Sequence, residues 1–518
     1  MADRKQFVFI TTLSIALGSY AVWKTHSYFS SEQRSSPSQV KLVSGGIPYF
    51  GHYFELKRDP VAFINRCKEE NGPAFRIHLK GKEIYVLTGS LIQDMLRQRK
   101  YYNFSLGLES FLPMRRALKV SYDHKYKGER LNRRDKNPVI YPIQHNFKPD
   151  QIDIFSDRIQ LGFTKVLYEQ LNLQPGEKRI VPLWDLLSMG VSQISCLAFA
   201  GSNVAYNQEL VVEMANFTRN LQKIGMTLMT FPDWIANFVI KHYLSVESQL
   251  DLIMDLIVPE MEKMRSGEIS HDHEPTYVSM ALNLPKADGE LRSPKEAAFY
   301  FRYVVMASVH TTTQYTSFAL HELACRPALV SDLRTKIEQL DKITPETVSQ
   351  IPLMDSFLRE VLRFNTHVLG LHHKTIQDAP LPSTGQVIPS GSLVLAASLD
   401  SHTNPEIMKE TVDIGGSSAL PLNQFDAYRY MGVYQQQKHM DKEELMRSST
   451  ISSELLTFGM FSHACPGRYF AVNEIKYILA ALIMQYNIST QSGERAMDYF
   501  FGGMTRFPSR EPLVFEGR

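Results

Sequence analysis

The strongest constraint on this chain comes from one cysteine, Cys465, in the loop Phe458-Gly459-Met460-Phe461-Ser462-His463-Ala464-Cys465-Pro466-Gly467-Arg468. Glycine and proline punctuate the loop, and an apolar, helix-patterned segment follows it directly. The N–H groups and the dipole of a helix start favour a thiolate over a thiol. The sequence therefore predicts a thiolate ligand, with a buried structural cysteine as the plainer alternative.

The neighbours of Cys465 carry a family resemblance. His463 lies two residues before it, Pro466-Gly467-Arg468 follows it, and Phe458 lies seven residues before it. The loop resembles the haem-binding loop of the cytochrome P450 superfamily, the haem-thiolate monooxygenases, and looks like that of fungal secondary-metabolite members. The resemblance implies that Cys465 is the axial ligand of the iron of haem b, and that His463 and Arg468 also bind the cofactor. Phe461 departs from the family pattern, which usually has a glycine there.

A second motif is expected on one long helix from Lys295 to Arg326, ended by Pro327. Helix spacing places Ala307, Ser308 and Thr311 on one face, where small residues allow a flat cofactor to come close. A mid-helix threonine can bond the carbonyl four residues back or release it to water. The segment resembles the oxygen-activation helix of the family, which implies cofactor contact for Ala307 and proton delivery by Thr311.

His310 stands on this helix where the family usually has an acid. Because histidine titrates near neutrality, His310 is either a proton relay or a packed polar residue. Both interpretations stay open from the sequence.

A third motif is an ExxR pair, Glu360 and Arg363. The spacing alone is uninformative, since Glu262 and Arg265 share it. Apolar neighbours nevertheless predict that the 360–363 pair is buried and needs a third partner. By resemblance that partner is Arg429, which completes a structural triad.

Two further features follow from the resemblance. His373 occupies a position where the family commonly has an arginine that binds a haem carboxylate. The basic segment 115–136 is either a solvated loop or a docking patch for an acidic electron donor, expected to be an NADPH-cytochrome P450 reductase.

Composition narrows the function classes. A net charge of +2 argues against a nucleic-acid binder, and four widely spaced cysteines support neither a disulfide framework nor a zinc ribbon. The uncharged stretch Phe7–Trp23 predicts a single membrane-spanning anchor within residues 1–30, with a cleaved signal peptide as the alternative. Residues 31–518 then form the catalytic domain, which the resemblance places on the cytosolic face of the endoplasmic reticulum.

The expected fold class is α+β, mostly α. Residues 76–79 and 83–87 predict a hairpin, residues 150–365 are mostly helical, and strand signals return at 371–374, 387–388 and 393–397. The polar segment 434–453 predicts an exposed loop. The resemblance supplies the cytochrome P450 fold, a helical prism around haem with small sheets.

The leading hypothesis is a monooxygenase that inserts one atom of O2 into a lipophilic small molecule, with electrons from NADPH through the reductase. The expected substrate is a terpenoid, polyketide or alkaloid intermediate. Ser308 and His310 keep open a haem-thiolate isomerase or dehydratase that does not use O2. Phe461 keeps open a catalytically impaired haem-binding relic.

Overall fold

The computed structural model describes residues 40–111, 113–121, 136–231, 233–269, 275–415, 419–435 and 446–518. The helices before the central one are α2 (Tyr53–Arg58), α3 (Pro60–Asn71), α4 (Ser90–Arg97), α5 (Phe104–Phe111), α6 (Met114–Ser121), α7 (Ile140–Asn146), η1 (Pro149–Phe155), α8 (Ser156–Gln170), α9 (Leu183–Ser195), η2 (Cys196–Ala200), α10 (Ser202–Ala205), α11 (Gln208–Thr230), α12 (Asp233–Tyr243), α13 (Glu247–Ser266) and α14 (Tyr277–Leu282). The central helix and those after it are α15 (Pro294–Ala324), α16 (Pro327–Ile337), α17 (Pro345–Ser349), α18 (Pro352–Phe364), α19 (Ser398–Thr403), α20 (Lys409–Gly415), α21 (Met431–Gln435), η6 (Phe461–His463) and α23 (Arg468–Gln485).

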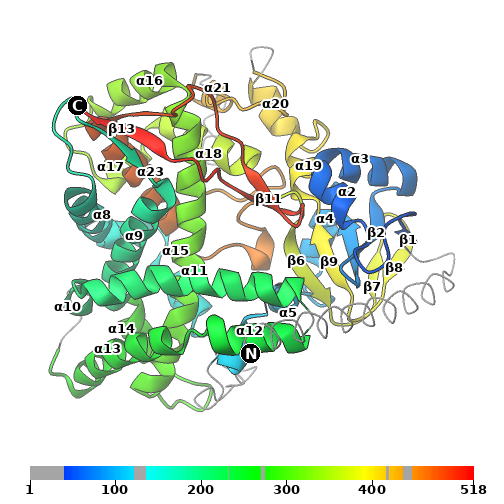
Figure 1. Ribbon diagram of the computed structural model, residues 1–518, viewed down its shortest axis with the longest axis horizontal. Helices are drawn as coiled ribbons and strands as arrows, with labels where there is room; N and C mark the ends of the chain where they lie inside the picture. Colours follow the sequence, from blue (N-terminus) through cyan, green and yellow to red (C-terminus); the bar gives the residue numbers. More distant parts are fainter. Residues whose placement is uncertain are drawn as a thin grey trace, which may run out of the picture.

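The largest sheet has the order β1-β2-β3-β9-β6-β4 and lies at one end of the molecule, on the right in Figure 1. Its strands are β1 (Lys41–Leu42), β2 (Ala74–Leu79), β3 (Lys82–Leu87), β4 (Tyr102–Asn103), β6 (Gly370–Thr375) and β9 (Leu393–Ala396). The predicted hairpin is confirmed as antiparallel β2–β3, with Ile77 opposite Ile84. Lys80 and Gly81 turn it with φ of 49° and 73°, as a two-residue turn requires.

Helix α15 crosses the middle of the molecule (Figure 1). Ser293 and Glu296 form a capping box at its start, with Pro294 in the first turn. The predicted long helix is therefore confirmed, but it ends at Ala324, and Pro327 begins α16 instead of ending α15.

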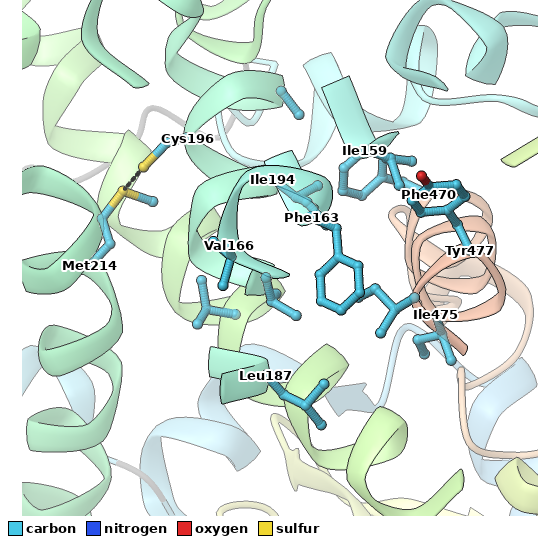
Figure 2. Packing of buried hydrophobic residues seen from close by; sticks show 14 of the residues in the cluster. Ile159, Phe163, Val166, Leu187, Ile194, Cys196, Met214, Phe470, Ile475 and Tyr477 are labelled. Carbon is cyan, nitrogen blue, oxygen red and sulfur yellow. Dashed lines mark hydrogen bonds between the residues drawn. The ribbon is translucent and has the colours of Figure 1, made fainter. Parts of the chain in front are cut away.

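The main apolar core joins α8, α9 and α23 around α15. Figure 2 shows Phe163 of α8 between residues of α9 and of α23. Gly190 of α9 has no room for a side chain, since an added Cβ would lie 2.8 Å from the Phe163 ring. The labelled residues on the two flanking helices are Leu187, Ile194, Phe470, Ile475 and Tyr477.

Three small sheets complete the fold, which is mostly helical as expected. They are β10-β13-β5, β11-β12 and β7-β8. Their strands are β5 (Lys178–Val181), β7 (Ala379–Leu381), β8 (Gln386–Ile388), β10 (Tyr486–Ser489), β11 (Tyr499–Phe501), β12 (Thr505–Phe507) and β13 (Leu513–Gly517).

The stretch 150–365 is mostly helical, as predicted, although it contains strand β5, which pairs with the C-terminal β13. One expectation about the body is corrected. The segment 434–453 is not simply an exposed loop, since Ser448 is buried and its hydroxyl contacts Asp355 of α18.

The predicted anchor within residues 1–30 lies outside the described residues. In the part of the chain that the structure describes, one helical segment, Leu183–Ala200, is long and apolar enough to span a bilayer. Since 83% of that segment is buried inside the protein, it is a core helix here.

Candidate active site

The cysteine loop closes on itself before α23 begins. The N–H of Cys465 donates to the Phe458 carbonyl at 2.7 Å. Gly459 has φ of +70°, and a Cβ there would lie 2.6 Å from the His463 carbonyl oxygen. The loop therefore needs glycine at 459, which fixes the path that brings the chain back to Cys465.

Burial and the neighbouring polar groups shift the pKa of Cys465 in opposite directions. Burial is the largest influence and raises the pKa of the thiol, while the N–H groups of Gly467 and Arg468 and the charge of Arg468 lower it. The predicted influence of the helix start is present, but burial outweighs it. A metal ion held by this sulfur would favour the thiolate, because a coordinating thiol loses its proton.

Phe461 takes the conformation that glycine usually takes. Its φ is +52°, and the residue is 45% exposed. The guanidinium of Arg97, at the end of α4, lies 5.4 Å from its ring centroid. The hydrogen bond from the Cys465 N–H to the Phe458 carbonyl forms with Phe461 in place. The loop is therefore closed although the backbone conformation of Phe461 costs about 1–3 kcal/mol.

The predicted face of α15 is open although most of this helix is buried. Ala307 and Thr311 are exposed, one turn apart, on a helix that crosses the interior. The Thr311 hydroxyl donates to the Ala307 carbonyl at 2.6 Å. The Ser308 hydroxyl reaches the Val305 carbonyl and Ser195, both at 3.2 Å. Small side chains thus border the open interior face, with a threonine hydroxyl available to exchange its partner.

His310 lies between two aromatic rings. Its ring centroid is 5.3 Å from that of Trp184 and 6.1 Å from that of Phe507. Burial lowers its pKa to about 4, so the imidazole is neutral at pH 7. Of the two interpretations open from the sequence, this geometry favours the packed polar residue.

The structure brings His373 and His463 together from distant parts of the chain. His373 Nδ1 donates to the Leu371 carbonyl at 2.6 Å, and its Nε2 lies 3.5 Å from His463 Nδ1. Burial lowers the pKa of His373 to about 4. His463 Nε2 is buried without a partner among the described residues, so it is a free polar atom at the edge of the site.

Arg468 makes its hydrogen bonds within the loop region. Its Nε donates to the Ser449 carbonyl at 3.1 Å, its Nη1 to the Cys465 carbonyl at 3.0 Å and its Nη2 to the Tyr469 hydroxyl at 2.7 Å. These bonds hold the loop in place, and the cofactor contact of Arg468 stays a prediction.

The ExxR pair is buried, as its apolar neighbours predict. Arg363 Nε and Nη2 each donate to one Glu360 carboxylate oxygen at 2.7 Å, and Arg429 Nε donates to the same carboxylate at 3.1 Å. All three side chains are at most 2% exposed. The remaining guanidinium N–H groups donate to backbone carbonyls, which include those of His402 and Leu420.

No sequence pattern pointed to His402, which joins the triad to the cysteine loop. Its Nε2 accepts from the Leu456 N–H at 2.8 Å, and its Nδ1 lies 2.9 Å from the Arg363 carbonyl oxygen. The Thr457 hydroxyl adds a bond to the Leu362 carbonyl at 2.8 Å. The start of the loop is thus fastened to the last turn of α18.

The basic segment 115–136, expected to be either a solvated loop or a docking patch for the electron donor, stays a prediction. Residues 122–135 lie outside the described part of the chain. On α6, Arg116 donates to Asn237 of α12 at 2.9 Å.

The comparisons with known proteins agree with this geometry. A family model described as Cytochrome P450 matches residues 43–411. Similar proteins include a cytochrome P450 monooxygenase (ascG) of Acremonium egyptiacum, 24% identical over 64% of this chain and 65% of its own length. They also include a cytochrome P450 monooxygenase (cdmJ) of Talaromyces verruculosus, 26% identical over 61% and 59%. An ent-kaurene oxidase of Gibberella intermedia is 24% identical over 64% of this chain and 63% of its own. The matched segments span less than two thirds of these relatives.

Solved structures show the same fold. A retinoic acid-bound cyanobacterial CYP120A1 aligns with a TM-score of 0.65 at 18% identity, over 93% of this chain and 99% of its own. The haem domain of cytochrome P450DA aligns with a TM-score of 0.67 at 14% identity, over 93% and 98%.

Proposed function

Because the chain belongs to the cytochrome P450 family, we propose that it is a haem-thiolate monooxygenase acting on a lipophilic small molecule. The closed loop that presents Cys465 is the observation that carries this proposal. The residues present fit haem. Cys465 is half-buried within the closed loop, Ala307 and Thr311 offer an open small-residue face, and His463 Nε2 is a buried atom without a partner among the described residues.

The residues take separate roles at this site. Cys465 would hold the iron, and His463 with His373 would lie at the haem carboxylates. Bound haem supplies activation of O2, so that one oxygen atom enters the substrate and the other leaves as water with two electrons and two protons. Thr311 would hold a proton at Oγ1 and pass it on when its bond to the Ala307 carbonyl exchanges for one to water.

Relatives support a more specific form of the proposal. Several are fungal monooxygenases, and one is named for ent-kaurene, an apolar hydrocarbon. The substrate proposed here is a terpenoid, polyketide or alkaloid intermediate. NADPH would supply electrons through an NADPH-cytochrome P450 reductase, and the stretch Phe7–Trp23 would anchor residues 31–518 to the endoplasmic reticulum membrane.

A family isomerase or dehydratase that does not use O2 is the second candidate, motivated by Ser308 and His310. A reconstituted assay with reductase, NADPH and a panel of lipophilic compounds separates the two. Product that contains label from ¹⁸O2 supports the monooxygenase, and product formed equally well without O2 supports the second candidate.

The first test is the absorption spectrum of the reduced protein with and without carbon monoxide. A strongly red-shifted Soret band is expected for the wild type and for Cys325→Ser, a matched control at another half-buried cysteine. Cys465→Ser should lose that band. A wild-type protein that binds no haem when haem is supplied contradicts the proposal and favours the impaired relic suggested by Phe461.

A second test addresses Thr311. Thr311→Ala should keep the carbon monoxide spectrum but lower product per NADPH by about 10- to 100-fold, the range expected when one positioned proton donor is lost. Thr311→Ser, which keeps the hydroxyl, should stay close to the wild type. Equal coupling in Thr311→Ala contradicts the proton role.

A further inference from the structure

Three segments that are distant in sequence are locked together beside the open face of α15. Gln314 Nε2, one turn after His310, donates to the Arg506 carbonyl at 2.9 Å. The Arg506 N–H donates to His367 Nδ1 at 3.2 Å. The N–H of Val368 donates to the Met504 carbonyl at 2.9 Å. The position and the ring orientation of His367 are therefore fixed by the backbone of β12 and its turn.

These bonds determine which ring nitrogen of His367 carries hydrogen. A backbone N–H only donates, so Nδ1 must accept and is unprotonated. Burial lowers the pKa of His367 to about 4, so the ring is neutral at pH 7 and its hydrogen is on Nε2. The ring is half-buried, and Nε2 has no hydrogen-bond partner among the described residues. His367 thus presents an oriented N–H donor with nothing to receive it.

The charged and titratable groups around this donor leave it little free positive charge. His310, a second neutral imidazole close enough to influence His367 electrostatically, packs between Trp184 and Phe507. The nearest cation, Arg506, is already used, since its guanidinium donates to Asp498 at 2.9 Å and to the Phe364 carbonyl at 2.6 Å. Little positive charge is left there to balance an anion.

His310 directly precedes Thr311, whose exposed face borders the space proposed for the substrate. We propose that His367 Nε2–H, with His310 beside it, forms the polar end of this site and binds a neutral oxygen acceptor, a carbonyl or hydroxyl, of an otherwise apolar molecule. The inference rests on the proposed function and narrows its substrate class. A carboxylate is disfavoured, because burying it without a cation costs far more than one hydrogen bond returns.

The test uses a pair of probes that differ at one group, 2-adamantanone and adamantane, with adamantane-1-carboxylate as the charged third member. Binding to the full-length, haem-loaded protein is measured by equilibrium dialysis with mass-spectrometric detection. The wild type should bind the ketone about 3- to 10-fold more tightly than the hydrocarbon, as one net hydrogen bond allows. The infrared stretch of the bound carbonyl should shift to lower wavenumber than in an alkane.

Two variants assign the effect to one atom. In His367→Asn the side-chain oxygen can still accept from the Arg506 N–H, but no donor remains at the place of Nε2. This variant should lose the ketone preference and the infrared shift while keeping its affinity for adamantane. His367→Gln puts an amide N–H near the place of Nε2 and should recover part of both.

Three results would overturn the inference. These are equal affinity for ketone and hydrocarbon in the wild type, an unchanged preference in His367→Asn, or tighter binding of the carboxylate than of the ketone. Circular dichroism melting of each variant shows whether it is folded. The carbon monoxide spectrum is read separately, so that failure of haem-thiolate ligation is distinguished from failure of the His367 contact.

Discussion

His402 and Arg363 each bond to the backbone carbonyl of the other. Arg363 Nη1 donates to the His402 carbonyl at 2.7 Å, and His402 Nδ1 donates to the Arg363 carbonyl at 2.9 Å. The other ring nitrogen of His402 accepts the Leu456 N–H. Because the last carbonyls of a helix lack partners within it, the end of α18 offers acceptors that side chains near the cysteine loop use. Hydrogen bonds through His402 therefore connect the Glu360–Arg363–Arg429 triad to the start of the cysteine loop.

Replacing His402 should weaken this connection and destabilise the protein. His402→Leu removes the acceptor of the buried Leu456 N–H and the donor to the Arg363 carbonyl, so we expect the free energy of unfolding to fall by about 2–4 kcal/mol. Urea unfolding measures this loss, and the ratio of haem to protein absorbance measures haem retention, which should fall as well. His402→Gln keeps an acceptor near Nε2 and should lose less. The control His145→Gln, at an exposed histidine, should stay within about 0.5 kcal/mol of the wild type. A His402→Leu protein as stable as that control contradicts the proposed role.

The buried Glu360 should matter far more than its sequence spacing suggests. Glu360→Gln leaves the guanidinium groups of Arg363 and Arg429 buried without their shared anion, which should cost about 3–5 kcal/mol. The matched control is Glu262→Gln, because Glu262 begins an ExxR pattern but is exposed on α13. That change should cost less than about 0.5 kcal/mol. Chemical unfolding of both variants compares the buried glutamate with the exposed one. A similar loss of unfolding free energy in both would contradict the structural role of Glu360.

The sequence predicted those features in which local pattern and burial agree. The hairpin β2–β3, the capped helix α15 and the burial of Glu360 with Arg363 follow from alternation, capping residues and apolar neighbours. The sequence did not reveal strand β5, because Lys178–Val181 is mostly exposed and becomes a strand only by pairing with β13, more than three hundred residues later. Such pairings leave little trace in local composition.

The hydrogen-bonding roles of single histidines could not be predicted from the sequence either. His367 and His402 owe their proton positions to the backbone of residues 506 and 456, which are brought near by the fold. The effect of Phe461 on the loop depended on a single φ angle that composition does not encode. The polar composition of segment 434–453 predicts an exposed loop, yet its Ser448 is buried against Asp355.

Phe461 allows a test of backbone strain in the cysteine loop. Its φ of +52° favours glycine, but Phe461→Gly also loses the contact with Arg97 and gains freedom in the unfolded chain. We expect these effects to leave stability within about 1 kcal/mol of the wild type. Phe461→Val places a β-branched residue at the same φ and should cost about 1–3 kcal/mol.

Thermal unfolding and haem content of the three proteins check this order. The wild type and Phe461→Gly should have similar stability, and Phe461→Val should be clearly less stable. A large rise in haem content in Phe461→Gly would mean that the native phenylalanine holds the loop away from the cofactor, as expected of an impaired relic.

Acid should destabilise the protein partly through His321 of α15. Its side chain is fully buried, its Nε2 donates to the Ser509 carbonyl at 3.2 Å, and burial lowers its pKa to about 4. An unfolded histidine has a pKa of about 6.5, so between pH 6.5 and about 4 the unfolded chain binds one more proton than the folded protein. The free energy of unfolding then falls with decreasing pH, by about 1.4 kcal/mol per pH unit from this group.

His321→Gln removes this contribution and keeps a donor for the Ser509 carbonyl. The difference between wild type and variant, measured by urea unfolding from pH 8 to pH 4.5, isolates His321 from the other buried histidines. Above pH 7 the two curves should be parallel, because the His321 ring is then unprotonated in both the folded and the unfolded protein. Below pH 6.5 the wild type should lose stability faster, by up to about 3 kcal/mol more at pH 4.5. Curves that stay parallel down to pH 4.5 would show that His321 titrates in the folded protein as it does in the unfolded chain.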